Sequence, residues 1–364
     1  AFTSFGKLGA LASSVARAWT PTTLFAAGEA GGLWDFSTLA NLYQDSAGTT
    51  PCTAVGDPIG KVLDTSGRGN HLTQSTSTKR PTLGRMPATG VRNLLVNTAT
   101  LSTQNVTTVA GSYTIQFTGA GSVTASGTYS GALTNGQTFT CTAGTLTLTV
   151  SGSVTNAQLE AGSTATAKQV VGAAYDITES GVASVYTAYF DGVDDCLVSP
   201  SIDFSGTDKM SVFAGVRKTT ETGLLDCLLE CADMFASTTG AFCLHTKANS
   251  VAGNAAFGSR GTMDKYSLRV LPTDTSAILT GVGNIGAPSV NLSVSGVSGE
   301  ATTTNQGGGT YPNSLMTVGS RITESYYVKG FLSALAVRGA ATDATTITSM
   351  EKWMAARTPG VTLP

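Results

Sequence analysis

Three aspartates that could bind a metal ion stand close together in the segment YFDGVDD: Asp191, Asp194 and Asp195. Ca²⁺ is a hard cation that takes several oxygen ligands, carboxylates among them. The cluster is therefore a candidate calcium site, and the sequence predicts no other cofactor. Its spacing does not match the twelve-residue calcium loop. Acids that form a turn at the start of a strand are the alternative interpretation, and both stay open.

Other titratable residues offer less for catalysis. Asp226, Glu230 and Asp233 lie together in LLDCLLECADMF, and glycoside hydrolysis uses a pair of carboxylates roughly 5–5.5 Å apart in retaining enzymes. The two histidines, His71 and His245, are not near a G-x-S-x-G nucleophile motif. We expect both histidines to be structural and predict that the chain is not an enzyme.

Six cysteines are spread along the chain without a metal-binding pattern. Cys227 and Cys231 are four residues apart, but no second pair or histidine cluster completes a zinc site. The spacing also lacks the density of a secreted disulfide framework. We expect buried or half-buried thiols in a chain that folds in a reducing cytoplasm.

The elements that must position these residues are expected to be β-strands. Among 364 residues, Thr and Ser number 94 and Gly 43, while only 12% are charged. Thr favours strands, and Gly and Ser favour turns. The net charge of −2, without a run of Lys or Arg, argues against a nucleic-acid partner. No apolar stretch approaches the roughly 18 residues of a membrane helix, so we predict an all-β protein without membrane insertion.

Residues 93–170 differ in composition and in sequence pattern from the rest of the chain. They are almost free of charge and contain short alternating segments separated by turn residues every 8–12 positions. In TLTLTVSGSV, Leu146 and Leu148 alternate with threonines, the period of a half-buried strand. We predict a small antiparallel sandwich inserted into a larger domain, formed by residues 24–92 and 171–364, behind a segment 1–23.

An amphipathic helix is predicted at the N-terminus. Phe5, Leu8, Ala12, Val15 and Trp19 recur every three or four residues, so they share one stripe. A helix of this length is marginal alone in water, and its stripe needs a surface to pack against. Packing on the chain's own sandwich and docking to another subunit or a larger assembly are the two interpretations.

A second short helix is predicted near the C-terminus. Asp343 is a credible N-cap, and Ile347, Met350 and Met354 share one face. We expect this face to seal one end of the sandwich.

A tight turn is predicted at DTSGRGN, residues 64–70. Asp64 can accept backbone N–H bonds, while Gly67 and Gly69 can supply positive φ. A phosphate-binding glycine loop is the alternative, but neither a helix start nor Gly-Lys-Ser/Thr follows it.

The order of several short motifs resembles that of tailed-bacteriophage virion proteins. The motifs are W-D-x-S (34–37), Q-D-x-A-G-T-T-P (44–51), G-D-P-I-G (56–60), D-T-S-G-R-G-N-H (64–71), R-P (80–81) and Y-F-D-G-V-D-D (189–195). Those proteins carry a concanavalin A-like, laminin-G-like jelly-roll sandwich. NLLVNTAT (93–100) through AQLEAGSTAT (157–166) is similar to the carbohydrate-binding-module-like sandwich found with it.

The resemblance implies a structural, non-enzymatic virion protein: a head fibre, a tail fibre or a capsid decoration. Such a protein is made in the host cytoplasm and lies on the virion surface, where it projects its sandwiches and aids attachment to the host. Its expected partners are other capsid or tail proteins and itself, as a homotrimer. The N-terminal stripe would then dock to the particle or bundle with sister chains.

Two other functions remain as alternatives. A glycan-binding adhesin would need exposed aromatic side chains, for which Tyr311, Tyr326 and Tyr327 are candidates, and a host-surface glycan would be its partner. A polysaccharide depolymerase is the third. Glycosidases of the resembled sandwich fold carry Glu-x-Asp-x-(x)-Glu, and this sequence lacks that pattern.

Overall fold

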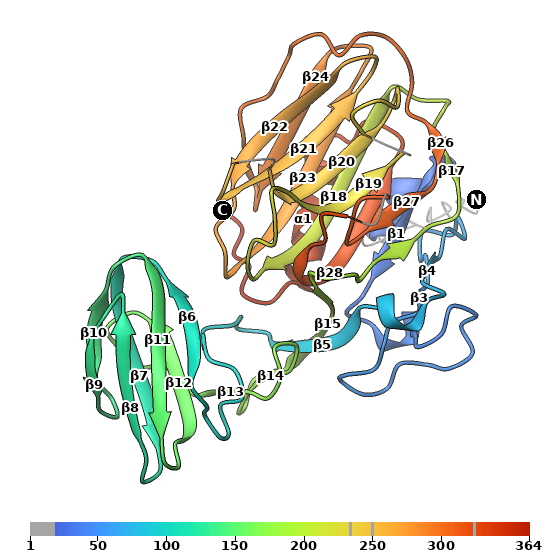
Figure 1. Cartoon of the computed structure of the whole chain (residues 1–364). Helices are drawn as coiled ribbons and strands as arrows, with labels where there is room; N and C mark the ends of the chain where they lie inside the picture. Colours follow the sequence, from blue (N-terminus) through green and yellow to red (C-terminus); the bar gives the residue numbers. More distant parts are fainter. Residues whose placement is uncertain (1–18, 233–234, 249–250, 323–324) are drawn as a thin grey trace, which may run out of the picture.

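The computed structural model describes residues 19–232, 235–248, 251–322 and 325–364. Within these ranges the chain is all-β, with a larger and a smaller β-sandwich and one α-helix (Figure 1). The predicted fold class, a jelly-roll sandwich interrupted by a smaller antiparallel one, is confirmed. No helix in these ranges is long and apolar enough to span a membrane.

The first sheet of the larger sandwich is built around long central strands. Neighbouring strands of this sheet pair antiparallel, and the strand β18 (Lys209–Lys218) is hydrogen-bonded along its whole length to β23 (Thr275–Asn284). In spatial order the sheet contains β25 (Val297–Ser298), β24 (Ser289–Val294), β23 (Thr275–Asn284), β18 (Lys209–Lys218), β28 (Lys329–Arg338), β15 (Ser184–Asp191) and β5 (Thr82–Pro87), with β1 (Gly31–Asp35) also paired to β28.

The second sheet faces the first and has shorter strands at one end. In spatial order it contains β2 (Leu42–Tyr43), β3 (Lys61–Val62), β4 (Leu72–Thr73), β16 (Leu197–Val198), β27 (Met316–Val318), β19 (Asp226–Cys231), β20 (Phe242–Lys247), β21 (Asn254–Arg260) and β22 (Asp264–Val270). The short connecting elements are η2 (Leu39–Asn41), η3 (Ser77–Lys79) and the pair β17 (Ile202–Asp203) with β26 (Asn313–Ser314).

The main core lies between these two sheets. Trp34, Phe190, Phe242 and Phe257 are fully buried in it. Burial of each such side chain contributes roughly 1.5–3 kcal/mol. The indole N–H of Trp34 donates to the carbonyl oxygen of Asn70 at 2.8 Å, so the ring enters the core without an unpaired donor.

The predicted turn at Asp64 is confirmed. Its Oδ1 accepts the backbone N–H of Leu33 at 2.9 Å and its Oδ2 accepts that of Asn70 at 2.9 Å. Gly67 and Gly69 both have positive φ, 86° and 76°. The carboxylate therefore joins the first strand of the sandwich to the turn, as a structural group.

The helix α1 (Ala344–Ala355) begins at the predicted N-cap. The Asp343 carboxylate accepts the backbone N–H of Thr346 at 2.9 Å. The buried side chains of Met350 and Met354 pack on β18, β23 and β28 together with η1 (Pro21–Phe25). The helix therefore covers the outer face of the first sheet, and the expectation that it seals one end of the sandwich is wrong.

The predicted N-terminal stripe falls mostly outside the described residues. Phe5, Leu8, Ala12 and Val15 lie there, so the helix itself stays a prediction. Trp19 is described, is half-buried and packs beside α1 and η1. At this one position the stripe contacts the chain's own sandwich.

The smaller sandwich consists of two antiparallel sheets with their own apolar core. One sheet contains β10 (Thr138–Cys141), β7 (Gly111–Thr118) and β12 (Thr155–Ala161); the other contains β6 (Gln104–Thr108), β11 (Gly144–Ser151), β8 (Ser122–Gly127) and β9 (Gly131–Leu133). In β11, Leu146 and Leu148 are buried while Thr145 and Thr149 are exposed. The alternation in the sequence therefore identified the core face of this strand.

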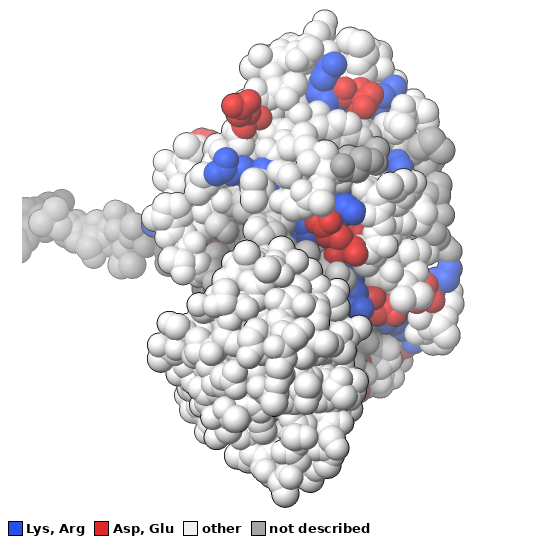
Figure 2. Space-filling view, turned by 60° about the vertical axis from the view of Figure 1, so that its left-hand side comes forward, with Lys and Arg blue, Asp and Glu red and all other residues white. Residues whose placement is uncertain are grey.

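The surface of the smaller sandwich is almost uncharged. Residues 93–170 contain only two charged side chains, Glu160 and Lys168, and Glu160 is buried. Figure 2 shows the lower lobe without a blue or red atom on the visible face.

The chain leaves the larger sandwich and returns to it at one place. β5 and β15 pair antiparallel, with Pro87 opposite Ser184. The hairpin of β13 (Gln169–Val171) and β14 (Ile177–Glu179) lies on the return path, between the two lobes (Figure 1). Adjacent exit and return points let a separate domain be inserted without disturbing the sheet.

The boundaries 93–170 stay a prediction that expression of the fragment tests. We expect residues 93–170 alone to give a β-type circular dichroism spectrum and a cooperative thermal transition, because the smaller sandwich has its own core. Leu148→Ala in the fragment should lower its stability by about 2–5 kcal/mol. A random-coil spectrum of the unmutated fragment would contradict the boundaries.

Candidate functional site

The acidic turn, defined as Asp191, Asp194 and Asp195, begins at the last residue of β15. One carboxylate oxygen from each residue lies within 4.8 Å of the others. The backbone N–H of Asp191 donates to Oδ2 of Asp195 at 2.8 Å, and that of Val193 donates to Oδ1 of Asp191 at 2.8 Å. The structure thus brings the three predicted residues together in a hydrogen-bonded turn, as both sequence interpretations require.

The donor set of the acidic turn is compatible with calcium. Ca²⁺ binds oxygens at 2.3–2.6 Å and takes six to eight of them, and three oxygens within 4.8 Å of one another can touch one such ion. The acidic turn would supply part of the coordination shell. Backbone N–H bonds already occupy two of its carboxylate oxygens.

Asp195 is the unusual member of the acidic turn. It is only 5% exposed, and burial, together with the charges of Asp191 and Asp194, raises its pKa to about 7. The backbone N–H of Asp191 opposes this rise. Near neutral pH, Asp195 therefore changes between a protonated and an ionised form.

The three candidate aromatic residues lie in different environments. Tyr311 is 1% exposed; its hydroxyl is hydrogen-bonded to that of Ser259 at 2.7 Å and its ring packs edge-on against Phe242. The expectation that Tyr311 contacts a glycan is therefore wrong, because its ring is part of the main core. Tyr327 is half-buried, while Tyr326 is 38% exposed.

The acidic residues of β19 serve the fold. The Glu230 carboxylate is fully buried and accepts two hydrogen bonds from the Arg321 guanidinium on Oε1, at 2.7 and 3.1 Å. The backbone N–H of Phe235 also donates to it at 3.0 Å. Asp226 is fully buried as well, with Oδ1 bonded to Thr222, and burial raises its pKa.

The histidines also have structural surroundings. Nδ1 of His71 accepts the backbone N–H of Asp64 at 2.9 Å. His245 is buried, and burial and the charge of Arg321 lower its pKa to about 3. Nδ1 of His245 has no hydrogen-bond partner among the described residues. All six cysteines are buried thiols, as predicted.

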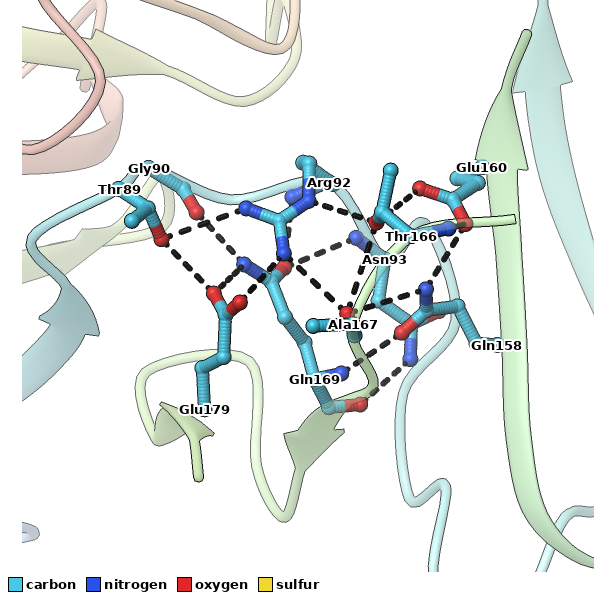
Figure 3. Close-up of polar contacts among 10 residues, drawn as sticks. All are labelled: Thr89, Gly90, Arg92, Asn93, Gln158, Glu160, Thr166, Ala167, Gln169 and Glu179. Carbon is cyan, nitrogen blue, oxygen red and sulfur yellow. Dashed lines mark hydrogen bonds and ion pairs between the residues drawn. The ribbon is translucent and has the colours of Figure 1, made fainter. Parts of the chain in front are cut away.

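A network of polar side chains joins the two sandwiches, with Gln169, Asn93 and Gln158 buried at its centre. We call it the junction (Figure 3). The Arg92 guanidinium binds Glu179 at 2.8 Å, Thr166 at 2.9 Å and the carbonyl of Ala167 at 3.2 Å. Burial raises the pKa of Glu179, but the hydrogen bonds from Arg92, Gln169 and Thr89 outweigh it, so this pKa lies below its usual value.

Gln169 is the centre of the junction and is fully buried. Its side-chain oxygen accepts the backbone N–H groups of Arg92 at 2.7 Å and Asn93 at 3.1 Å, and its Nε2 donates to Gly90 and Glu179. Asn93 in turn donates to the carbonyls of Ala157 and Gln169. The outgoing and returning segments are thereby tied to each other and to β12.

Two clefts flank the outgoing segment between the sandwiches. The Glu160 cleft, of about 340 Å³, is lined by Arg92, Thr107, Tyr113, Glu160 and Asp274 among others. The Lys329 cleft, of about 320 Å³, is lined by Asn93, Asn105, Tyr189, Arg217, Lys329 and Phe331 among others. Both volumes fall within the range of small-molecule sites, which occur preferentially between domains.

Sequence reasoning missed the junction and both clefts. Their residues come from segments far apart in the chain, and none forms a local motif. One signal was present: Arg92 and Glu179 are charged residues at the borders of a charge-poor segment, and Asn93 and Gln169 stand beside them.

Comparisons with known proteins find likeness in solved structures alone, since no family model and no curated protein sequence matches the chain. It is similar to a heptameric pentraxin from Limulus polyphemus (12% identity, TM-score 0.36, 45% of this chain and 80% of that one). It is also similar to domain 4 of a GH43 arabinanase from Geobacillus stearothermophilus in complex with arabinotriose (15%, 0.37, 51% and 82%). A third is the CBM40 of a Ruminococcus gnavus sialidase bound to α2,3-sialyllactose (11%, 0.33, 40% and 83%).

These matches assign no family. Identities of 11–15% and TM-scores of 0.33–0.37 are too low to transfer a ligand or a site. The β-sandwich architecture rests on the chain's own sheets, and the resemblance to phage virion proteins rests on the motif order in the sequence.

The raised pKa of Asp195 predicts a pH-dependent effect of Asp195→Asn. The folded state holds this proton more tightly than the unfolded state, where the pKa is near 3.8. The stabilisation is therefore present below about pH 4 and is lost as pH rises through 7. In EDTA, we expect the variant to melt a few degrees above the wild type at pH 8, with the gap closing towards pH 4.

Asp194→Asn is the control, because it removes a charge from the same turn but at a half-buried side chain. It should raise the melting temperature less. Equal melting temperatures of wild type and Asp195→Asn across the whole pH range would contradict the prediction. A rise of the wild-type melting temperature on adding Ca²⁺, absent from Asp195→Asn, would identify the acidic turn as the calcium site.

Proposed function

We propose that the chain is a non-enzymatic structural protein of a tailed-bacteriophage virion whose two β-sandwiches project from the particle and bind carbohydrate on the host surface. The motif order in the sequence supports the virion assignment. Such a protein is a head fibre, a tail fibre or a capsid decoration, and its expected assembly is a homotrimer.

The observation that carries the binding role is the junction with its two clefts. A hydrogen-bonded network whose central side chains, Gln169 and Asn93, are buried holds one sandwich against the other, because leaving a buried polar group unpaired costs free energy. The walls of the clefts are therefore held in place before a ligand arrives. Preorganised walls reduce the ordering cost of binding.

The surroundings of the acidic residues support a non-enzymatic role. The Glu230 carboxylate is paired with Arg321 and saturated with hydrogen bonds, and Asp226 is buried and accepts a hydrogen bond from the Thr222 hydroxyl. A general acid or a nucleophile has to reach the glycosidic bond of its substrate. Neither of these carboxylates is exposed.

Binding without turnover is the direct test. We expect the protein to bind host-surface polysaccharide on a glycan array and to release no reducing ends from it. Asp226→Asn and Glu230→Gln should bind as the wild type does, although Glu230→Gln should melt lower because it leaves Arg321 without its counter-ion. Hydrolysis by the wild type that either variant abolishes would overturn the non-enzymatic role.

Attachment to the particle is tested by removing residues 1–18, which carry most of the predicted stripe. We expect both sandwiches to fold, because each has its own apolar core built from its strands. Incorporation into virions should be lost, and the oligomeric state measured by light scattering should fall. The deletion retains Trp19, because this residue packs beside α1 and belongs to the described fold. Truncated protein found on virions at wild-type occupancy would contradict docking by this segment.

A further inference from the structure

The Lys329 cleft combines walls from both sandwiches. Asn93 and Asn105 contribute from the outgoing segment and β6, while Tyr189 and Phe331 contribute from β15 and β28. The aromatic rings of Tyr189 and Phe331 pack against each other with centroids 5.1 Å apart. Tyr189 is 7% and Phe331 3% exposed, so their rings offer a ligand little surface, while the amide of Asn105 is exposed. A ligand in this cleft would lie between the two domains.

The residues that line the cleft carry one more positive than negative charge. Its charged lining residues are Arg217, Lys329 and Asp274. Asp274 is already held by Arg217, whose two Nη atoms bind its carbonyl at 2.7 Å and its carboxylate at 3.1 Å. Lys329 is half-buried and has no ion pair in the described part of the chain, although Asp191 is its partner in the strand register.

A second polar group in the wall also lacks a partner. Arg217 is 5% exposed, and its Nε is buried without a hydrogen-bond acceptor among the described residues. Buried donors are nearly always paired, and each exception calls for an explanation. Here the unpaired donor belongs to a cation that lines the same cleft as Lys329.

These observations favour an acidic over a neutral sugar. A neutral ring filling the cleft would cover the ammonium group of Lys329 without compensating its charge, which is unfavourable. A carboxylate would supply the missing partner through a charge-assisted hydrogen bond. The hydroxyls of a sugar ring suit the amide of Asn105, whose side chain is exposed.

We propose that the Lys329 cleft binds a carboxylate-bearing saccharide, with its carboxylate at Lys329 and its hydroxyls at Asn105. This inference rests on the proposed function and deepens it by naming the site and the class of ligand. The shared chemistry, a carboxylate on a hydroxylated ring, occurs in uronic acids and in sialic acids.

Two matched pairs of probes separate charge from shape and distinguish the two sources. Trigalacturonate is compared with its neutral methyl ester, and α2,3-sialyllactose with lactose. Binding to the full chain is measured by titration calorimetry in EDTA, so that no metal ion on the acidic turn bridges to the carboxylate. We expect one acidic probe to bind at least tenfold more tightly than its neutral partner, and the affinity to fall with added salt.

Variants on the two walls locate the site. Lys329→Gln removes the charge and should weaken binding of the acidic probe about tenfold or more. Asn105→Asp places a negative charge on the opposite wall, at an exposed position of the smaller sandwich, and should weaken it as well. Lys352→Gln on α1 and Thr124→Asp on β8 are the matched controls; both are exposed, lie outside the cleft lining, and should leave binding unchanged.

The outcomes separate this inference from the proposed function. Acidic binding that both cleft variants weaken and both controls retain supports the proposal. Acidic binding that neither Lys329→Gln nor Asn105→Asp changes would overturn the site. Binding of neutral glycans alone would overturn the ligand class and leave the carbohydrate-binding function intact. Failure of every glycan to bind would overturn both.

Discussion

The antiparallel pairing of β5 with β15 is the constraint on which the rest of the architecture depends. It places Pro87 opposite Ser184, so the chain leaves and re-enters the first sheet at neighbouring positions. A domain inserted there adds no crossing connection to the larger sandwich. The same pairing brings the outgoing segment beside the hairpin of β13 and β14, and so makes the junction and the clefts possible.

The junction turns two adjacent connections into a defined orientation. A pair of linkers alone would leave the smaller sandwich free to swing. Gln169 and Asn93 instead bind backbone groups of both segments inside a buried network, and Arg92 adds an ion pair with Glu179. Any rotation of the smaller sandwich would break some of these hydrogen bonds. Buried polar groups would then be left without a partner and away from water, which is unfavourable. Polar groups thus specify the arrangement between two apolar cores.

The residues with conspicuous chemistry mostly serve the fold, whereas the best binding surface is made of residues without a motif. The Asp64 carboxylate accepts backbone N–H groups, and the Glu230 carboxylate is paired with an arginine. The cleft around Lys329 draws instead on ordinary strand residues whose side chains meet only after two domains pack. The acidic turn is the exception, a local cluster that is also assembled in space.

The sequence by itself determined what depends on neighbours along the chain. The alternation of Leu146 and Leu148 with threonines identified a strand and its buried face, and the spacing of Asp64 with its glycines identified a turn, because both follow from local backbone geometry. Only the tertiary structure decided that Tyr311 is buried and that Lys329 faces a cleft. Burial and cleft formation depend on contacts between segments far apart in sequence, and residue type and spacing carry no record of which distant surface will cover a side chain.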